Sequence, residues 1–291
     1  MADQLTETSA RRITIDSSAG PLAALAGFPI DGSATTILLL VPGYTGSKED
    51  FAPILDPLAD LGFAAIAIDQ PGQFESPGPA DEAEYAPRAL GAVLASVVKR
   101  LTAEHPGHPI VLLGHSFGGL VSREAVLASA DVRGLVLLCS GPAAFVNGNR
   151  FDALTSGEPV LRRYGAQVLY DRGQAAAGLD PHDPHPLQQF LRRRFLASDP
   201  NALLGMGGAL LTEPDRTAEL ADVLARRRIP VAVIAGEADD AWPLDTQRVM
   251  AATLETELVL VPGGAHSPAV EAPENLVALL APLLRRWVPA G

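Results

Sequence analysis

Short apolar runs alternate along this chain with longer segments in which apolar residues recur at helical spacing. The runs predict strands at residues 36–41, 63–68, 110–113, 135–138, 231–235 and 257–261. The longer segments predict helices at residues 48–59, 83–102, 118–128, 243–254 and 273–287. Strands that alternate with helices form a mostly parallel sheet covered on both faces, so the expected fold class is α/β. Residues 12–15 and 21–28 are expected to add an antiparallel hairpin before this sheet.

The pentapeptide Gly114-His115-Ser116-Phe117-Gly118 lies between the third apolar run and the helix that follows it. It has the pattern G-x-S-x-G in the strand–turn–helix context of a nucleophile elbow, where a strained turn exposes a serine hydroxyl beside a helix N-terminus. The pattern also occurs by chance in about one chain in ten of this length, as an ordinary turn with an exposed serine. Ser116 is therefore a candidate nucleophile if a base and an acid are found elsewhere.

Two later loops supply these partners. His266 lies in a glycine-rich loop directly after the last predicted strand, where a rigid strand end can position a general base. Asp239 and Asp240 follow the preceding strand, and a carboxylate there can fix the tautomer of the histidine and stabilise its protonated form. The two aspartates point in different directions, so only one can bind His266, and Glu237 is the next candidate.

On these residues the chain resembles the α/β-hydrolase family, in which the triad follows the same order of Ser, Asp and His. The resemblance covers nearly the whole chain, through loops at residues 41–46, 66–76, 114–118, 236–243 and 264–274. It implies that Ser116 is the nucleophile and His266 the base. It favours Asp239 as the acid, because Asp239 stands three residues after Gly236, as the acid of the family does.

The resemblance also implies an oxyanion hole made by the backbone N–H groups of Tyr44 and Phe117. Many members have His-Gly where this chain has Pro42-Gly43, a departure that changes the loop but leaves its backbone donor in place. Because both donors are backbone groups, the side chains of Tyr44 and Phe117 are free to shape a pocket.

Residues 141–217 interrupt the alternation, since they contain no clear strand and mix Pro, Gly, Arg and Leu. A long insertion after a strand would lie over the active site, and this one resembles the helical cap of many α/β-hydrolases. We expect one domain, residues 1–291, with a cap at residues 141–217. The expected pocket residues are Tyr44, Phe145, Leu204, Met206, Leu210 and Trp242.

These features predict a serine hydrolase that needs no cofactor and acts on an ester, thioester or lactone of a small to medium, largely apolar acyl group. The fold leaves two alternatives open. One is a C–C bond hydrolase or lyase with the same triad. The other is a ligand receptor that keeps the triad but turns over slowly.

The composition favours a small-molecule substrate over a nucleic acid or a membrane as the partner of this protein. A net charge of −12 argues against nucleic acid, and the absence of any apolar run near 18 residues argues against a membrane span. The single cysteine and the polar first residues predict a cytoplasmic protein. Cys139 is expected to be a buried thiol, and His115 to pack or hydrogen-bond structurally. No metal is expected, because His182 and His185 have no further ligands nearby in the sequence.

Overall fold

The computed structural model describes residues 2–30, 32, 34 and 36–288. Within them, eight strands form one sheet in the order β1-β2-β4-β3-β5-β6-β7-β8. In this order, the six strands β4, β3, β5, β6, β7 and β8 pair in parallel. At one edge β1 and β2 form an antiparallel hairpin, and β2 also pairs antiparallel with β4. Their bounds are Arg11–Ser17, Gly20–Gly27, Ile37–Val41, Ala64–Ile68, Ile110–His115, Gly134–Leu138, Val231–Gly236 and Leu258–Val261 for β1 to β8.

Apolar residues on both faces of each central strand build two cores. In β3, Ile37, Leu39 and Val41 belong to one core, whereas Leu38 and Leu40 belong to the other. Successive side chains of a strand point to opposite faces, so an unbroken apolar run fits a sheet that is covered on both sides. The predicted α/β fold is confirmed.

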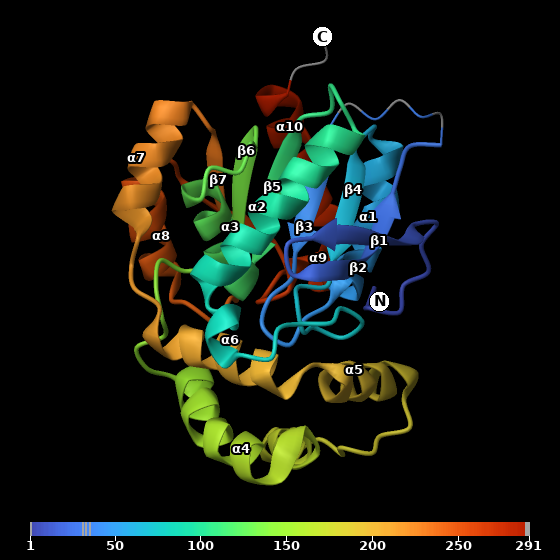
Figure 1. Cartoon of the computed structure of the whole chain (residues 1–291), viewed down its shortest axis with the longest axis vertical. Coiled ribbons are helices and arrows are strands. Elements are labelled where there is room, and N and C mark those ends of the chain that lie inside the picture. The colour runs from blue at the N-terminus through green and yellow to red at the C-terminus, as the bar shows by residue number, and fades with distance from the viewer. Residues whose placement is uncertain (1, 31, 33, 35, 289–291) are drawn as a thin grey trace.

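The helices beside the sheet divide between these cores (Figure 1). Buried residues of α2 (Pro87–Glu104), α3 (Phe117–Leu127), α7 (Thr217–Arg227) and α8 (Leu244–Thr253) join the first core. Those of α1 (Ala52–Asp60), α9 (Pro268–Glu271) and α10 (Pro273–Trp287) join the second. Residues 48–59 and 83–102, each predicted as one helix, begin instead with the 3-10 turns Lys48–Phe51 and Glu82–Tyr85. Pro87 causes the second break, because it holds Ala86 in an extended conformation.

The helices α4 (Asn149–Ala176), α5 (Pro186–Ala197) and α6 (Pro200–Thr212) lie together across one end of the sheet (Figure 1). We call these three helices the helical layer. Helix α4 is kinked at Gly165, whose φ of 81° is readily adopted only by glycine. The kink lets residues from both halves of α4 face one cavity, described below.

Candidate active site

Ser116 lies in the turn between β5 and α3, as its motif predicts. Its φ of 54° and ψ of −122° are strained for a residue with a side chain. A Cβ atom on Gly114 would approach the oxygen of Gly118 to 2.3 Å, and one on Gly118 would approach the oxygen of Val41 to 2.3 Å. The glycines of the motif therefore permit a turn too tight for any other residue, and the turn presents the serine at the carboxyl end of the sheet.

Ser116, His266 and Asp239 form one chain of hydrogen bonds. The Nε2 atom of His266 is 3.0 Å from the Oγ of Ser116, and its Nδ1 atom is 2.8 Å from the Oδ1 of Asp239. A carboxylate can only accept a hydrogen bond, so Nδ1 carries the hydrogen and Nε2 presents its lone pair to the serine hydroxyl. This geometry makes Nε2 a base toward Ser116.

The carboxylate of Asp239 is fully buried and held by further donors. The backbone N–H of Ala241 donates to Oδ1 at 3.0 Å, and the Nε2 of Gln247 donates to Oδ2 at 2.8 Å. Burial alone would raise the pKa of Asp239, but its hydrogen bond to His266 and these donors lower the pKa on balance. No motif in the sequence marks Gln247, which stands on α8. Asp240, by contrast, is exposed and pairs with Arg150 at 2.6 Å.

His115 packs directly against His266. The ring centroids are 5.0 Å apart, and the Nε2 of His115 donates to the backbone carbonyl of His266 at 2.6 Å. Burial and the neighbouring His266 lower the pKa of His115 to about 4, so its ring is neutral near pH 7. The predicted structural role thus includes a contact with the loop that carries the base.

The loop after β3 lies against Ser116. A Cβ atom on Gly43 would be 3.0 Å from the Cβ of Ser116, so only glycine fits there without displacing the serine. Tyr44 follows it, and the Tyr44 hydroxyl donates to the carbonyl of Leu203 in α6 at 3.1 Å. Phe117 is the first residue of α3, where backbone N–H groups have no partner within the helix.

Two cavities meet at Tyr44, Ala153 and Leu154. The catalytic cavity has a volume of about 600 Å³ and contains Ser116 and His266 in its wall. The second, which we call the apolar cavity, has a volume of about 320 Å³. Leucines, glycines and aromatic rings of the helical layer line the apolar cavity, among them Leu161, Leu169, Tyr170, Phe195, Leu204, Gly208 and Leu211.

The expected pocket residues divide between wall and core. Tyr44, Phe145 and Leu210 line the catalytic cavity, and Tyr44 and Leu204 line the apolar cavity. Met206 and Trp242 line neither, which corrects their predicted placement. Met206 is buried on the face of α6 toward the sheet, with its sulfur 3.9 Å from the Nε2 of Gln73.

The ring of Trp242 packs on Phe145 at 4.5 Å, and its N–H donates to the carbonyl of Ala143 at 3.0 Å. Trp242 is close in sequence to Asp239, but these contacts keep its ring in the core and out of the wall of either cavity.

Two ion pairs lie in the wall of the catalytic cavity. Arg194 of α5 pairs with Asp50 at 2.5 Å, and Arg150 of α4 pairs with Asp240. All four line this cavity. The Arg194 side chain is only 11% exposed. Its partner Asp50, distant in sequence, is the reason.

Potential metal ligands gather only around the triad among the described residues. His115, Cys139 and His266 form one such group, and Asp239, Asp240 and His266 form another. A metal ion bound through His266 would compete with the hydrogen bonds that already use both of its ring nitrogens. Burial and the charge of Asp239 raise the pKa of the Cys139 thiol, which disfavours a thiolate ligand. None of the described helices is long and apolar enough to cross a membrane.

A mostly parallel sheet with a serine in the turn after a central strand, and an acid and a histidine on later loops, defines the class of α/β-hydrolase folds. Residues 38–279 match the sequence model of the Alpha/beta hydrolase family, and the chain belongs to this family. The expectation drawn from the five loops is confirmed.

Two individual relatives and one solved structure are similar to this chain at 23–28% sequence identity. The chain is 28% identical over 254 residues to a pimeloyl-[acyl-carrier protein] methyl ester esterase of Xylella fastidiosa, covering 84% of this chain and 92% of the relative. It is 23% identical over 255 residues to a putative 2-succinyl-6-hydroxy-2,4-cyclohexadiene-1-carboxylate synthase of Bacillus subtilis, covering 83% and 87%. A thermophilic esterase structure from Thermogutta terrifontis matches with a TM-score of 0.71 and 23% identity, covering 96% of this chain and all of that one.

Proposed function

We propose that the chain is a serine hydrolase that cleaves a carboxylic ester, thioester or lactone through an acyl-enzyme. The observation that carries the proposal is the hydrogen-bonded chain from Ser116 through His266 to Asp239. It contains the nucleophile, base and orienting acid of acyl transfer within hydrogen-bond distance of one another. The methyl ester esterase of Xylella fastidiosa, similar over most of its length, supports the same bond type.

The first half of the reaction forms the acyl-enzyme. The Oγ of Ser116 attacks the acyl carbon while the Nε2 of His266 accepts the serine proton. Asp239 stabilises the imidazolium and keeps its N–H directed away from the serine. The tetrahedral intermediate then expels the alcohol or thiol, which takes the proton from Nε2. In the second half, water attacks the acyl carbon with His266 as base, and Ser116 is released with the acid product.

The backbone N–H groups of Tyr44 and Phe117 are the proposed oxyanion hole. Gly43 lies against Ser116 on one side, and Phe117 begins the helix on the other. Fixed donors beside the nucleophile stabilise the charge that develops on the carbonyl oxygen, and removing one such donor costs about 3–4 kcal/mol of barrier.

The two cavities support a small to medium, largely apolar acyl group. We assign the acyl chain to the apolar cavity, because it is lined by leucines and aromatic rings and joins the catalytic cavity at Tyr44 and Leu154. Each methylene buried there contributes about 0.8 kcal/mol. The helical layer, together with the loops beside it at residues 141–217, then acts as the cap of the site, and the leaving group faces the two ion pairs of the catalytic cavity.

A second candidate is C–C bond cleavage or a lyase reaction with the same triad. It is favoured by the similarity to the putative cyclohexadiene-carboxylate synthase of Bacillus subtilis. A slowly turning-over receptor would retain the triad as well, and comparison of single-turnover with steady-state rates separates it from an enzyme.

Labelling with a fluorophosphonate tests the nucleophile directly. Wild-type protein is expected to be labelled at Ser116, and Ser116→Ala is expected to lower kcat on p-nitrophenyl esters by about 10⁴-fold or more. Ser122→Ala is the matched control, because Ser122 is a fully buried serine of the adjacent helix and should leave labelling intact. Labelling that persists in Ser116→Ala refutes the assignment. Labelling without turnover of any ester, thioester or lactone favours the second candidate.

A further inference from the structure

The loop after β4 holds the oxyanion loop through two buried glutamines. The Nε2 of Gln70 donates to the carbonyl of Pro42 at 2.8 Å, and the Nε2 of Gln73 donates to the carbonyl of Gly43 at 2.7 Å. Both side chains are at most 2% exposed. Burying an amide side chain is unfavourable unless it is hydrogen-bonded, and these two amides bind the carbonyls of successive residues. This arrangement indicates that the two glutamines fix the path of the oxyanion loop.

The Gln73 amide is fixed at both ends. Its Oε1 accepts from the backbone N–H of Gln70 at 3.0 Å, while its Nε2 donates to Gly43. Since an N–H can only donate and a carbonyl can only accept, the reversed amide would face a donor with a donor and an acceptor with an acceptor. The amide therefore has one orientation.

That orientation controls the Gly43–Tyr44 peptide. The Gly43 carbonyl accepts from Gln73 and also from the N–H of Gly46 at 3.1 Å. A trans peptide is planar, so the Tyr44 N–H points opposite to this carbonyl. With the oxygen bound on the Gln73 side, the N–H is directed away from Gln73. Tyr44 and Ser116 line the same cavity.

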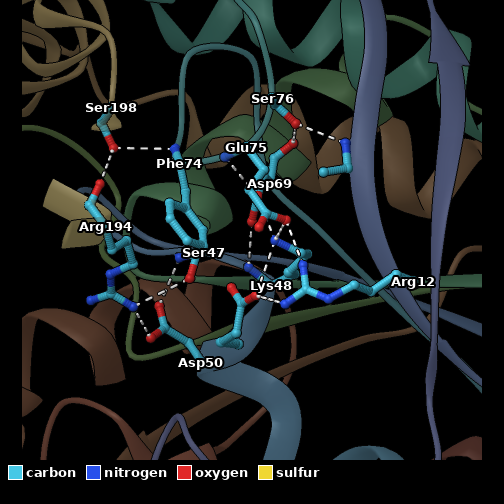
Figure 2. Close-up of polar contacts among 12 residues, drawn as sticks. Arg12, Ser47, Lys48, Asp50, Asp69, Phe74, Glu75, Ser76, Arg194 and Ser198 are labelled. Atoms are coloured by element: carbon cyan, nitrogen blue, oxygen red, sulfur yellow. Dashed lines mark hydrogen bonds and ion pairs between the residues drawn. The ribbon is translucent and has the colours of Figure 1, made fainter. Parts of the chain in front are cut away.

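Hydrogen bonds also hold Asp69, Phe74 and Glu75, which are near Gln73 in the same loop and are labelled in Figure 2. Asp69, fully buried, accepts from the backbone N–H of Lys48 at 2.7 Å, from its Nζ at 2.9 Å, and from the N–H of Glu75 at 3.2 Å. The N–H of Phe74 donates to the Oγ of Ser198 at 3.2 Å. The contacts of Asp69, Phe74 and Glu75 hold the backbone on both sides of Gln73. The Gln73 side chain therefore binds the Gly43 carbonyl from a fixed position.

We propose that Gln73 is a positioning residue of the oxyanion hole, which holds the Gly43 carbonyl so that the Tyr44 N–H stays aimed at the developing oxyanion. Without the Gln73 donor, the peptide plane can rotate and the N–H loses its direction. The inference rests on the proposed acyl-transfer function, and it assigns the contribution to the transition state rather than to substrate binding.

Gln73→Met keeps the length of the side chain and removes the donor. It is expected to lower both kcat and the second-order rate of fluorophosphonate labelling by about 10–100-fold, a part of the loss of a whole oxyanion donor, with KM changed by less than about threefold. Affinity for an alkyl boronic acid, which forms a tetrahedral adduct on Ser116, should fall by a similar factor. Gln189→Met is the matched control, since it makes the same exchange at an exposed glutamine of α5 that lines neither cavity. It should keep wild-type kcat.

Gln73→Glu supplies a signature that general damage to the fold does not produce. A protonated carboxyl can donate to Gly43 and accept from Gln70, whereas the carboxylate repels the Gly43 oxygen. Burial favours the protonated form. The ratio of variant to wild-type kcat should therefore be highest at low pH and fall as pH rises, while the ratio for Gln73→Met stays flat.

Two results overturn the proposal. One is a rise in KM at unchanged kcat in Gln73→Met, and the other is a kcat ratio of Gln73→Glu that is flat with pH and as low as the ratio of Gln73→Met. If the wild type is not labelled at Ser116, the proposed function itself fails. If it is labelled and both Gln73 variants react at the wild-type rate, only this inference fails.

Discussion

Replacing His115 by glutamine tests whether a buried neutral histidine beside the proposed base makes stability depend on pH. His115 touches His266 through its ring and through the bond to the His266 carbonyl. Burial and the charge of His266 lower its pKa from 6.5 to about 4, and the hydrogen bond to the His266 carbonyl, followed by the charges of Asp50 and Asp239, opposes this only partly. Glutamine keeps an N–H donor but cannot titrate in this range.

The expected magnitude follows from this pKa. The unfolded chain binds a proton at His115 below about pH 6.5, whereas the folded chain binds it only below about pH 4. The contribution of neutral His115 to stability is therefore complete above pH 6.5 and is lost as pH falls toward 4. A difference of about 2.5 pKa units corresponds to about 3 kcal/mol at most, of which about 2 kcal/mol is lost between about pH 7.5 and about pH 5.

Urea denaturation at these two pH values measures the loss. The wild type should lose about 2 kcal/mol more unfolding free energy on acidification than His115→Gln, whatever the stability of the variant at neutral pH. His182→Gln, which replaces an exposed histidine of the loop between α4 and α5, is the matched control and should lose as much as the wild type. Equal losses in the wild type and His115→Gln would refute the reasoning.

Two further changes test the acid and the acyl pocket. Asp239→Asn should lower kcat by about 10²–10⁴-fold, whereas Asp240→Asn should stay within a few fold, because only Asp239 bonds His266; equal losses would contradict the assignment. In the wild type each added acyl methylene should raise kcat/KM by up to about fourfold until the apolar cavity is full. Gly208→Leu should move the preferred acyl ester to a shorter chain, since a Cβ on Gly208 meets no atom within 4 Å and this glycine lines that cavity. An unchanged chain-length profile, measured on p-nitrophenyl esters, would place the acyl chain elsewhere.

The fold and the order of the site could be predicted because both depend on short-range patterns. An apolar run such as residues 37–41 has few alternatives to a buried strand, and the glycines around Ser116 are required by contacts within the turn itself. His266 and Asp239 could be placed because parallel strands bring the loops at their carboxyl ends to one edge of the sheet. The predicted pocket positions of Met206 and Trp242 were wrong, because the sequence pattern does not show which face of a helix or loop points toward the cavity.

The supporting residues of the site escaped prediction for a different physical reason. Gln73 and Arg194 act through partners far away in sequence, at Gly43 and Asp50 respectively. Gln247 is only eight residues from its partner Asp239, but it stands on a helix and Asp239 in the loop before it. A glutamine on a helix or in a loop is by default a solvated residue, and nothing in its neighbours marks the backbone carbonyl or carboxylate that it will meet.

Such residues become visible only when the fold shows which polar groups would otherwise be buried without a partner. Removing Gln73 would take one of its two donors from the Gly43 carbonyl and would leave the Gln70 N–H without its acceptor, so the requirement for an amide at this position comes from the loop it supports. The same logic applies to Gln247, which satisfies a carboxylate oxygen of Asp239 that water cannot reach. The proposed reacting groups thus stand in motifs that can be recognised in the sequence. The groups proposed to position them are found only from the hydrogen-bond donors and acceptors that the fold brings together.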